Sequence, residues 1–174
     1  MNVREINIEK PVVKKQYASL EDLVKAVQTS LSEITIFTSG TTGQPKQVRH
    51  TIQTLTRSVR IGTGYQGQVW GFAYNPTHMA GLQVFFQAFE NLNTLVNIFN
   101  RSRSEVNAVL KSAGITHLSA TPTFYRLLLP VEEVFEKVQR VTLGGEKSDQ
   151  KLYDFIRQLF PCARINNVYA STEA

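Results

Sequence analysis

The sequence predicts an α/β fold with a mainly parallel sheet and alternating helices, and two observations support that class. The chain alternates between segments of helical period and short segments of extended period. Six extended segments are separated by helical segments, as expected for a sheet whose ligand loops lie at the carboxyl ends of its strands. With 174 residues, 42% of them hydrophobic and 19% charged, the chain is about one domain long.

The first predicted elements lead to a glycine-rich loop. A helix is predicted over 19–31, because five aliphatic side chains share one face and Ser19 and Asp22 have capping-box spacing. Residues 34–38 (ITIFT) follow as a short buried strand that runs directly into the loop. The next helix is predicted over 51–61, so the expected order is strand, loop, helix.

The remaining elements alternate regularly. Strands are predicted at 68–74, 94–99, 116–120, 140–145 and 163–170, and helices at 78–91, 102–114, 123–129 and 148–160. The helix over 102–114 has the clearest boundary signals, with Ser102 at the N-cap, Glu105 three residues later and Gly114 at the end.

Composition and charge narrow the functional classes. Cys162 is the one cysteine, so an internal disulfide framework is excluded and a cytoplasmic location is expected. No apolar run is long enough to predict a membrane span, and the charged N-terminus is unlike an export signal. The net charge of +5 favours an anionic partner, either nucleic acid or a small phosphate. Nucleic acid is disfavoured, because the basic residues are dispersed and form no recognised motif.

Two glycine-containing segments were compared with nucleotide-loop templates. Residues 40–47 (GTTGQPKQ) lack the glycine, lysine and hydroxyl spacing of a Walker loop. Residues 62–67 (GTGYQG) match GxGxxG, but they follow a predicted helix and precede a strand, which reverses the order of a Rossmann fingerprint. This second segment is interpreted as a connecting turn.

The loop after residues 34–38 has a composition suited to binding phosphate. Short hydroxyl side chains alternate with glycines that admit a close backbone approach: Thr38, Ser39, Gly40, Thr41, Thr42 and Gly43. Lys46 adds a positive charge. Most loops of this composition are solvated connections, so composition alone leaves a polar surface loop as the alternative.

Four segments resemble the adenylate-forming superfamily, which includes the acyl-CoA synthetases, the luciferases and the adenylation domains of peptide synthetases. Residues 38–46 (TSGTTGQPK) are similar to its phosphate-loop signature, and residues 168–174 (VYASTEA) resemble its Tyr-Gly-x-Thr-Glu segment. Weaker similarities occur at 75–82 (NPTHMAGL) and 142–147 (TLGGEK). The four segments follow the family's order.

The resemblance implies a reaction in which a carboxylic acid attacks ATP to give an acyl-adenylate and pyrophosphate, after which coenzyme A captures the acyl group. By similarity, the phosphates are held by Thr38 to Gly43, Lys46 and Thr172, and Mg²⁺ is bound by Glu173. The adenine ring stacks on Tyr169 and lies along the turn formed by Gly144, Gly145 and Glu146. His78 lies in the acyl pocket. Lys46, Thr172 and Glu173 are the implied catalytic residues. Such groups suit phosphoryl-type transfer, which relies on positioning and charge neutralisation. Glu146 and Lys147 replace the small residue and proline of many relatives.

Several of these residues have a structural alternative. Glu173 alone would be an ordinary surface carboxylate, His78 fits the cap of the following helix, and Tyr169 fits a core position. The aromatic residues Phe85, Phe86 and Phe89 are expected to form a buried helix face rather than a substrate pocket. His50 and His117 have no assigned role, and no cluster with metal-site spacing predicts a structural zinc.

The resemblance covers residues 1–174 as part of the large N-terminal AMP-binding domain, without the family's C-terminal lid domain. The short region before the phosphate loop resembles the compact o-succinylbenzoate-CoA ligases, so an acid-CoA ligase is the first expectation. Loading of a carrier protein is the enzymatic alternative, and an ATP- or AMP-binding module without catalysis is the other. The acid and the oligomeric state are left open.

Overall fold

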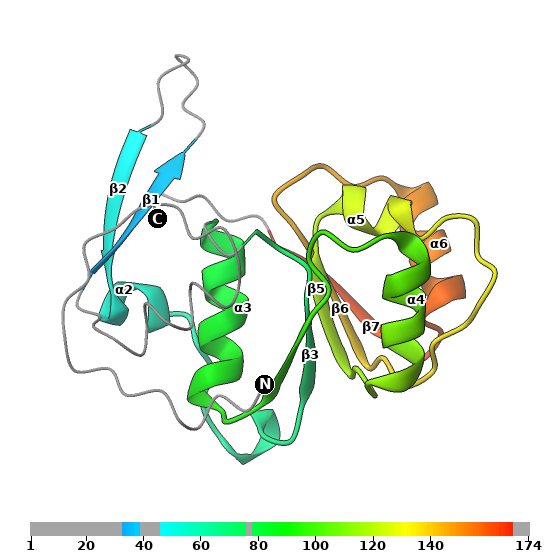
Figure 1. Cartoon of the computed structure of the whole chain (residues 1–174), viewed down its shortest axis with the longest axis horizontal. Helices are drawn as coiled ribbons and strands as arrows, with labels where there is room; N and C mark the ends of the chain where they lie inside the picture. Colours follow the sequence, from blue (N-terminus) through cyan, green and yellow to red (C-terminus); the bar gives the residue numbers. More distant parts are fainter. Residues whose placement is uncertain (1–32, 39–45, 76–77, 169–174) are drawn as a thin grey trace.

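The larger of two sheets carries most of the structure. The computed structural model describes residues 33–38, 46–75 and 78–168. Within them, five parallel strands have the order β4–β3–β5–β6–β7 (Figure 1). They are β3 (Val69–Phe72), β4 (Thr94–Asn97), β5 (His117–Ala120), β6 (Arg140–Gly144) and β7 (Arg164–Val168). The α/β class with a mainly parallel sheet is confirmed, and each strand lies inside a predicted one.

Helices cover both faces of this sheet. α3 (Met79–Glu90) packs on β3 and β4, while α4 (Arg103–Ser112), α5 (Pro122–Leu127) and α6 (Gln150–Leu159) lie on the opposite side (Figure 1). The chain runs from β3 outward to β4 and then crosses back to β5 on the other side of β3. The sheet therefore has a topological switch point between β3 and β5, where open α/β sheets bind their ligands.

The larger sheet separates two apolar clusters. Trp70, Phe72 and Leu95 belong to the cluster under α3, which also includes Ile36 and Leu55 from the first part of the chain. The cluster under α4, α5 and α6 contains Leu118, Ala120, Val141 and Leu143 from the strands, together with Val106, Tyr125 and Ile156 from the helices. Successive strand residues point to opposite faces, so β3 contributes Trp70 and Phe72 to the first cluster and Val69 to the second.

The predicted cap of α4 is confirmed. The Ser102 hydroxyl accepts a hydrogen bond from the Glu105 amide at 3.4 Å, and the Glu105 carboxylate accepts one from the Ser102 amide at 2.8 Å. This capping box supplies partners for amides that the helix itself leaves unpaired. Hydrogen bonding to Ser102 lowers the pKa of Glu105.

The predicted order of strand, loop and helix misses one strand. The loop is followed by β2 (Lys46–Thr51), which pairs antiparallel with β1 (Glu33–Thr38). The helix α2 (Ile52–Thr56) lies within the predicted range 51–61 but is shorter, and the Thr51 hydroxyl before it accepts a hydrogen bond from the Thr54 amide. Pairing with β1 across the loop satisfies backbone groups of 46–51, and the residue pattern of 46–51 alone does not report such pairing.

Two other expectations concern the first half of the chain. Residues 62–67 connect α2 to β3 through a 3₁₀ turn at Thr63–Tyr65, which confirms the connecting-turn interpretation. The helix predicted over 19–31 lies outside the described residues. Within the described ranges, no helix has the length and apolar character needed to span a bilayer.

Candidate functional site

The parallel strands bring several predicted site residues to one edge of the larger sheet. β5, β6 and β7 end at Ala120, Gly144 and Val168, and Gly144 pairs with Val168 in the ladder. The glycine turn therefore begins beside the strand that leads directly into Tyr169. This edge also contains the switch point, so it is the part of the sheet best suited to a ligand.

Tyr74 joins three strands at this edge. It follows β3, is 5% exposed, and forms a hydrogen bond with the side chain of Ser119 on β5. Its hydroxyl would lie 3.2 Å from a Cβ placed on Gly144 of β6. Burial, followed by the negative charge of Glu146, raises the pKa of Tyr74, so its hydroxyl is protonated at neutral pH. The residue therefore supplies a neutral hydroxyl beside the glycine turn.

The glycine turn leaves its backbone open on one side. Gly145 has a φ of 82°, a left-handed conformation that favours glycine. Among the described residues, a Cβ at Gly145 would meet only Thr121, at 4.0 Å. Gly144 is more enclosed by Tyr74 and Val168. Gly145 is therefore the less enclosed of the two glycines within the described part of the chain.

Glu146 lies in the same turn but turns its carboxylate to a neighbouring helix. One carboxylate oxygen, Oε2, accepts hydrogen bonds from the amide of Thr123 at 3.0 Å and from its hydroxyl at 2.6 Å. Thr123 lies in the first turn of α5, where amides have no partner within the helix. These contacts link the predicted adenine turn to α5.

The start of α3 approaches the carboxyl end of β3 closely. A Cβ on Gly81 would overlap the carbonyl oxygen of Asn75, so only glycine allows this contact. His78 is at the N-cap of α3 and is exposed, but its side chain makes no capping hydrogen bond. The structural alternative for His78, a position at the cap of the helix, is confirmed without a capping bond from its side chain, and its acyl-pocket role stays a prediction.

The two ends of the predicted phosphate loop are held together by the hairpin. Thr38 ends β1 and pairs with Lys46, the first residue of β2. The loop is therefore carried by two antiparallel strands rather than placed between a strand and a helix. The other loop residues, Ser39, Gly40, Thr41, Thr42 and Gly43, lie outside the described residues, as do Tyr169, Thr172 and Glu173.

Sequence reasoning missed Tyr74, Ser119 and Thr123. Tyr74 and Ser119 had a usable signal, because Tyr74 is the last residue and Ser119 the penultimate residue of predicted strands that end at the ligand edge. Phe85 and Phe86 are buried as expected, whereas Phe89 is only partly buried. Across the described ranges, no group of three or more His, Cys, Asp or Glu side chains is arranged to hold a metal ion.

Comparison with known proteins gives a consistent result. The model of a family described as AMP-binding enzymes matches residues 9–174. A D-alanine–D-alanyl carrier protein ligase from Streptococcus pneumoniae (strain 70585) is 30% identical over 156 residues, covering 80% of this chain and 30% of the ligase. Bacitracin synthase 3 from Bacillus licheniformis is 30% identical over 155 residues, covering 79% of this chain and 2% of the synthase.

Solved structures agree on the fold. The o-succinylbenzoate coenzyme A synthetase from Bacillus subtilis, in complex with AMP, has a TM-score of 0.66 and 25% identity, covering 80% of this chain and 30% of that chain. The N-terminal domain of FACL13 from Mycobacterium tuberculosis has a TM-score of 0.69 and 17% identity, covering 98% of this chain and 41% of that one. The chain spans well under half of each of these relatives.

Proposed function

The chain belongs to the family of AMP-binding enzymes, and we propose that it provides the nucleotide site for ATP-dependent activation of a carboxylic acid to an acyl-adenylate. The observation that carries this proposal is the open glycine turn at Gly144 and Gly145, which lies at the ligand edge of the sheet beside Tyr74. The hairpin adds a loop whose ends, Thr38 and Lys46, are paired.

Each part of the site would have a separate task in this reaction. The loop from Thr38 to Lys46 would bind the phosphates, and the glycine turn would receive the adenine ring, stacked against Tyr169. Glu173 would hold Mg²⁺, which offsets the negative charge of the phosphates. His78 would face the acid. Catalysis would then come from alignment of the carboxylate with the α-phosphate and from charge neutralisation.

The acceptor of the acyl group is proposed to be coenzyme A, with o-succinylbenzoate as the first candidate acid. Similarity to the Bacillus subtilis synthetase supports this choice. A carrier protein is the alternative acceptor, and it has equal support from the ligase and synthase relatives. Exchange of radiolabelled pyrophosphate into ATP, measured with o-succinylbenzoate, D-alanine and a panel of amino acids, distinguishes these acids. A chain that binds ATP but shows no exchange with any acid would be a binding module instead.

The first test is calorimetric titration of the chain with Mg-ATP. Lys46→Ala is expected to weaken binding about tenfold or more, because a charge-assisted contact contributes about 1.5–3 kcal/mol. The melting temperature should change little, since Lys46 begins a strand at the end of a loop. Absence of Mg-ATP binding by the folded wild-type chain would contradict the proposed nucleotide site.

A further inference from the structure

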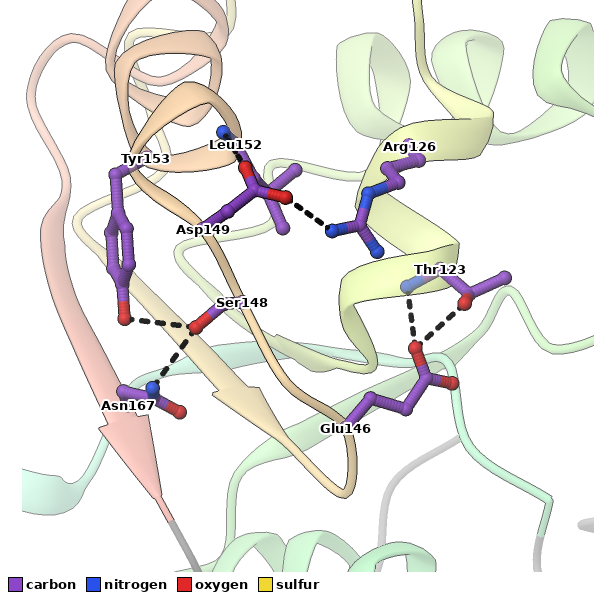
Figure 2. A network of polar contacts seen from close by, with 8 residues as sticks. All are labelled: Thr123, Arg126, Glu146, Ser148, Asp149, Leu152, Tyr153 and Asn167. Atoms are coloured by element: carbon purple, nitrogen blue, oxygen red, sulfur yellow. Dashed lines mark hydrogen bonds and ion pairs between the residues drawn. The ribbon is translucent and has the colours of Figure 1, made fainter.

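The segment between β6 and α6 is attached to three neighbouring elements through its side chains (Figure 2). Glu146 bonds Thr123 at the start of α5, as described above. The Ser148 hydroxyl lies 3.2 Å from the Tyr153 hydroxyl on α6 and accepts a hydrogen bond from the Asn167 amide group on β7 at 3.0 Å. The segment that starts at Gly144 is thus bonded to α5, α6 and β7.

Asp149 completes these attachments at the far end of the segment. Its Oδ1 accepts a hydrogen bond from the Leu152 amide at 2.8 Å and caps α6. Its Oδ2 accepts one from the Arg126 guanidinium on α5 at 2.9 Å. The bond from Leu152 and the contact with Arg126 lower the pKa of Asp149. Asp149 therefore links α5 and α6 at the C-terminal end of the segment. Glu146 makes the corresponding contact at its N-terminal end.

Glu146 is the attachment closest to the open glycine. It follows Gly145 directly, and Gly145 has the left-handed backbone that leaves its face accessible. Because glycine has the largest backbone freedom to lose on ordering, an open glycine turn needs an external contact to keep one conformation. The two hydrogen bonds from Thr123 provide that contact within one residue of Gly145.

We infer that Glu146 is a positioning residue for the nucleotide: it holds the Gly144–Gly145 turn in its open conformation by binding Thr123, and does not itself bind the base. This inference rests on the proposed function, since it assigns the adenine-facing turn to the same site. It changes the interpretation of Glu146 from a direct ligand of the nucleotide to a group that acts through the backbone of Gly145.

The contacts support a role through Thr123. Both hydrogen bonds from Thr123 end on the same carboxylate oxygen, Oε2, and the shorter one, at 2.6 Å, has the length of a charge-assisted bond. Turning Oε2 towards the nucleotide would leave the Thr123 amide in the first turn of α5 without this partner. Contact through Oε1 would keep both bonds, and the double-mutant cycle described below separates that case from a role through Thr123.

The first arm of the test uses the chain without nucleotide. Hydrogen–deuterium exchange of the amides at 145–149 should become faster in Glu146→Ala than in the wild type. Glu146→Gln keeps an oxygen that can accept from Thr123, so it should restore most of the protection. Glu136→Ala removes an exposed carboxylate elsewhere and is the matched control. Unchanged exchange in Glu146→Ala would overturn the inference, whatever the chain binds.

The second arm measures the affinity for Mg-ATP and for tripolyphosphate, which has no adenine. Glu146→Ala should weaken Mg-ATP binding about tenfold, the lower end of the loss seen when groups that orient ligands are removed. Tripolyphosphate affinity should stay unchanged, whereas Lys46→Ala should weaken both. Equal losses of both ligands in Glu146→Ala would indicate general destabilisation and would contradict a positioning role.

A double-mutant cycle with Thr123→Val separates positioning from direct contact. If Glu146 acts through Thr123, the double variant should bind Mg-ATP about as weakly as Glu146→Ala alone, because coupled residues are not additive. If the loss of Mg-ATP affinity in the double variant equals the product of the losses in the two single variants, Glu146 contacts the nucleotide directly. That result would overturn the inference. If the wild type binds no Mg-ATP while exchange still quickens in Glu146→Ala, the proposed function fails and the fixation of the turn by Glu146 stands.

Discussion

The two faces of the five-stranded sheet differ in the side chains that the same strands present. On the face under α4, α5 and α6, Leu118, Val141 and Leu143 are all fully buried in one apolar cluster. This face continues as core from one strand to the next. It requires only that apolar volumes match, which is the general condition for a packed interior.

The opposite face changes its character between β3 and β5. Trp70 and Phe72 of β3 belong to the apolar cluster under α3. The residues that pair with them on β5 are His117 and Ser119, and the rings of Trp70 and His117 lie 4.9 Å apart. The change from apolar to polar therefore occurs at the switch point. One face stabilises the fold, whereas the other also supplies polar groups to the candidate site.

The neighbours Leu118 and Ser119 offer the sharpest test of this difference, because they point to opposite faces. Leu118→Ala should lower the free energy of unfolding by about 2–5 kcal/mol, as expected for a large-to-small change in a packed core. Ser119→Ala should cost only about 1 kcal/mol, through the lost hydrogen bond to Tyr74. Urea unfolding of both variants measures the two values.

Ile61→Ala is the control for this pair. Ile61 is 67% exposed, so removing its side chain should change the free energy of unfolding by less than about 0.5 kcal/mol. Similar losses for Leu118→Ala and Ser119→Ala would contradict the claim that the two faces have different roles.

A second variant tests the close contact on the α3 face. Gly81→Ala would place a methyl group against the carbonyl of Asn75 and displace the backbone after β3. The expected loss is about 1–3 kcal/mol, as for other overpacked positions. Gly64→Ala is the matched control, because a Cβ there meets no described residue within 4 Å. Thermal melting of the two variants should separate them, and equal melting temperatures would rule out a tight contact at Gly81.

The polar part of the α3 face should also make stability depend on pH. Burial, with a smaller effect of the positive charge of Arg140, lowers the pKa of His117 from 6.5 to about 4. The folded state therefore binds this proton less tightly than the unfolded state. The contribution of His117 to stability is complete above pH 6.5 and is lost as the pH falls towards 4, by about 1–2 kcal/mol between pH 7 and pH 5.

Urea unfolding of the wild type and of His117→Gln at the two pH values measures this contribution. Other groups also titrate in this range, so the informative quantity is the difference between the pH dependences of the two proteins. The wild type should lose more stability than the variant on going from pH 7 to pH 5. Parallel losses would mean that His117 takes up its proton equally well in both states.

The elements that the sequence predicted correctly are those specified by local signals. Ser102 and Glu105 lie three residues apart and form the capping box that their spacing indicates. The strands are short segments of extended period, and their alternation with helical segments along the chain implies the parallel sheet. The position of Gly144 and Gly145 at the ligand edge follows from the same reasoning, since they end a predicted strand.

The parts that the sequence could not predict depend on pairing between segments, which the pattern within one segment does not report. β2 is extended because it pairs with β1 across the glycine-rich loop, and the predicted helix begins only after it. Glu146 and Thr123 are 23 residues apart in the sequence, and no pattern of residue types predicts the hydrogen bonds between them. Tertiary contacts of this kind set the details of the candidate site, whereas local patterns set only its position in the fold.

The smallest expected effect concerns the helix that covers the apolar face. Ser102→Ala removes the hydroxyl that accepts from the Glu105 amide at the start of α4, and should cost about 0.5–1 kcal/mol. The exposed Ser58→Ala serves as the control. Urea unfolding should show a loss for Ser102→Ala well below that of Leu118→Ala. A loss as large as that of the core variant would mean that this face depends on its helix ends as much as on apolar packing.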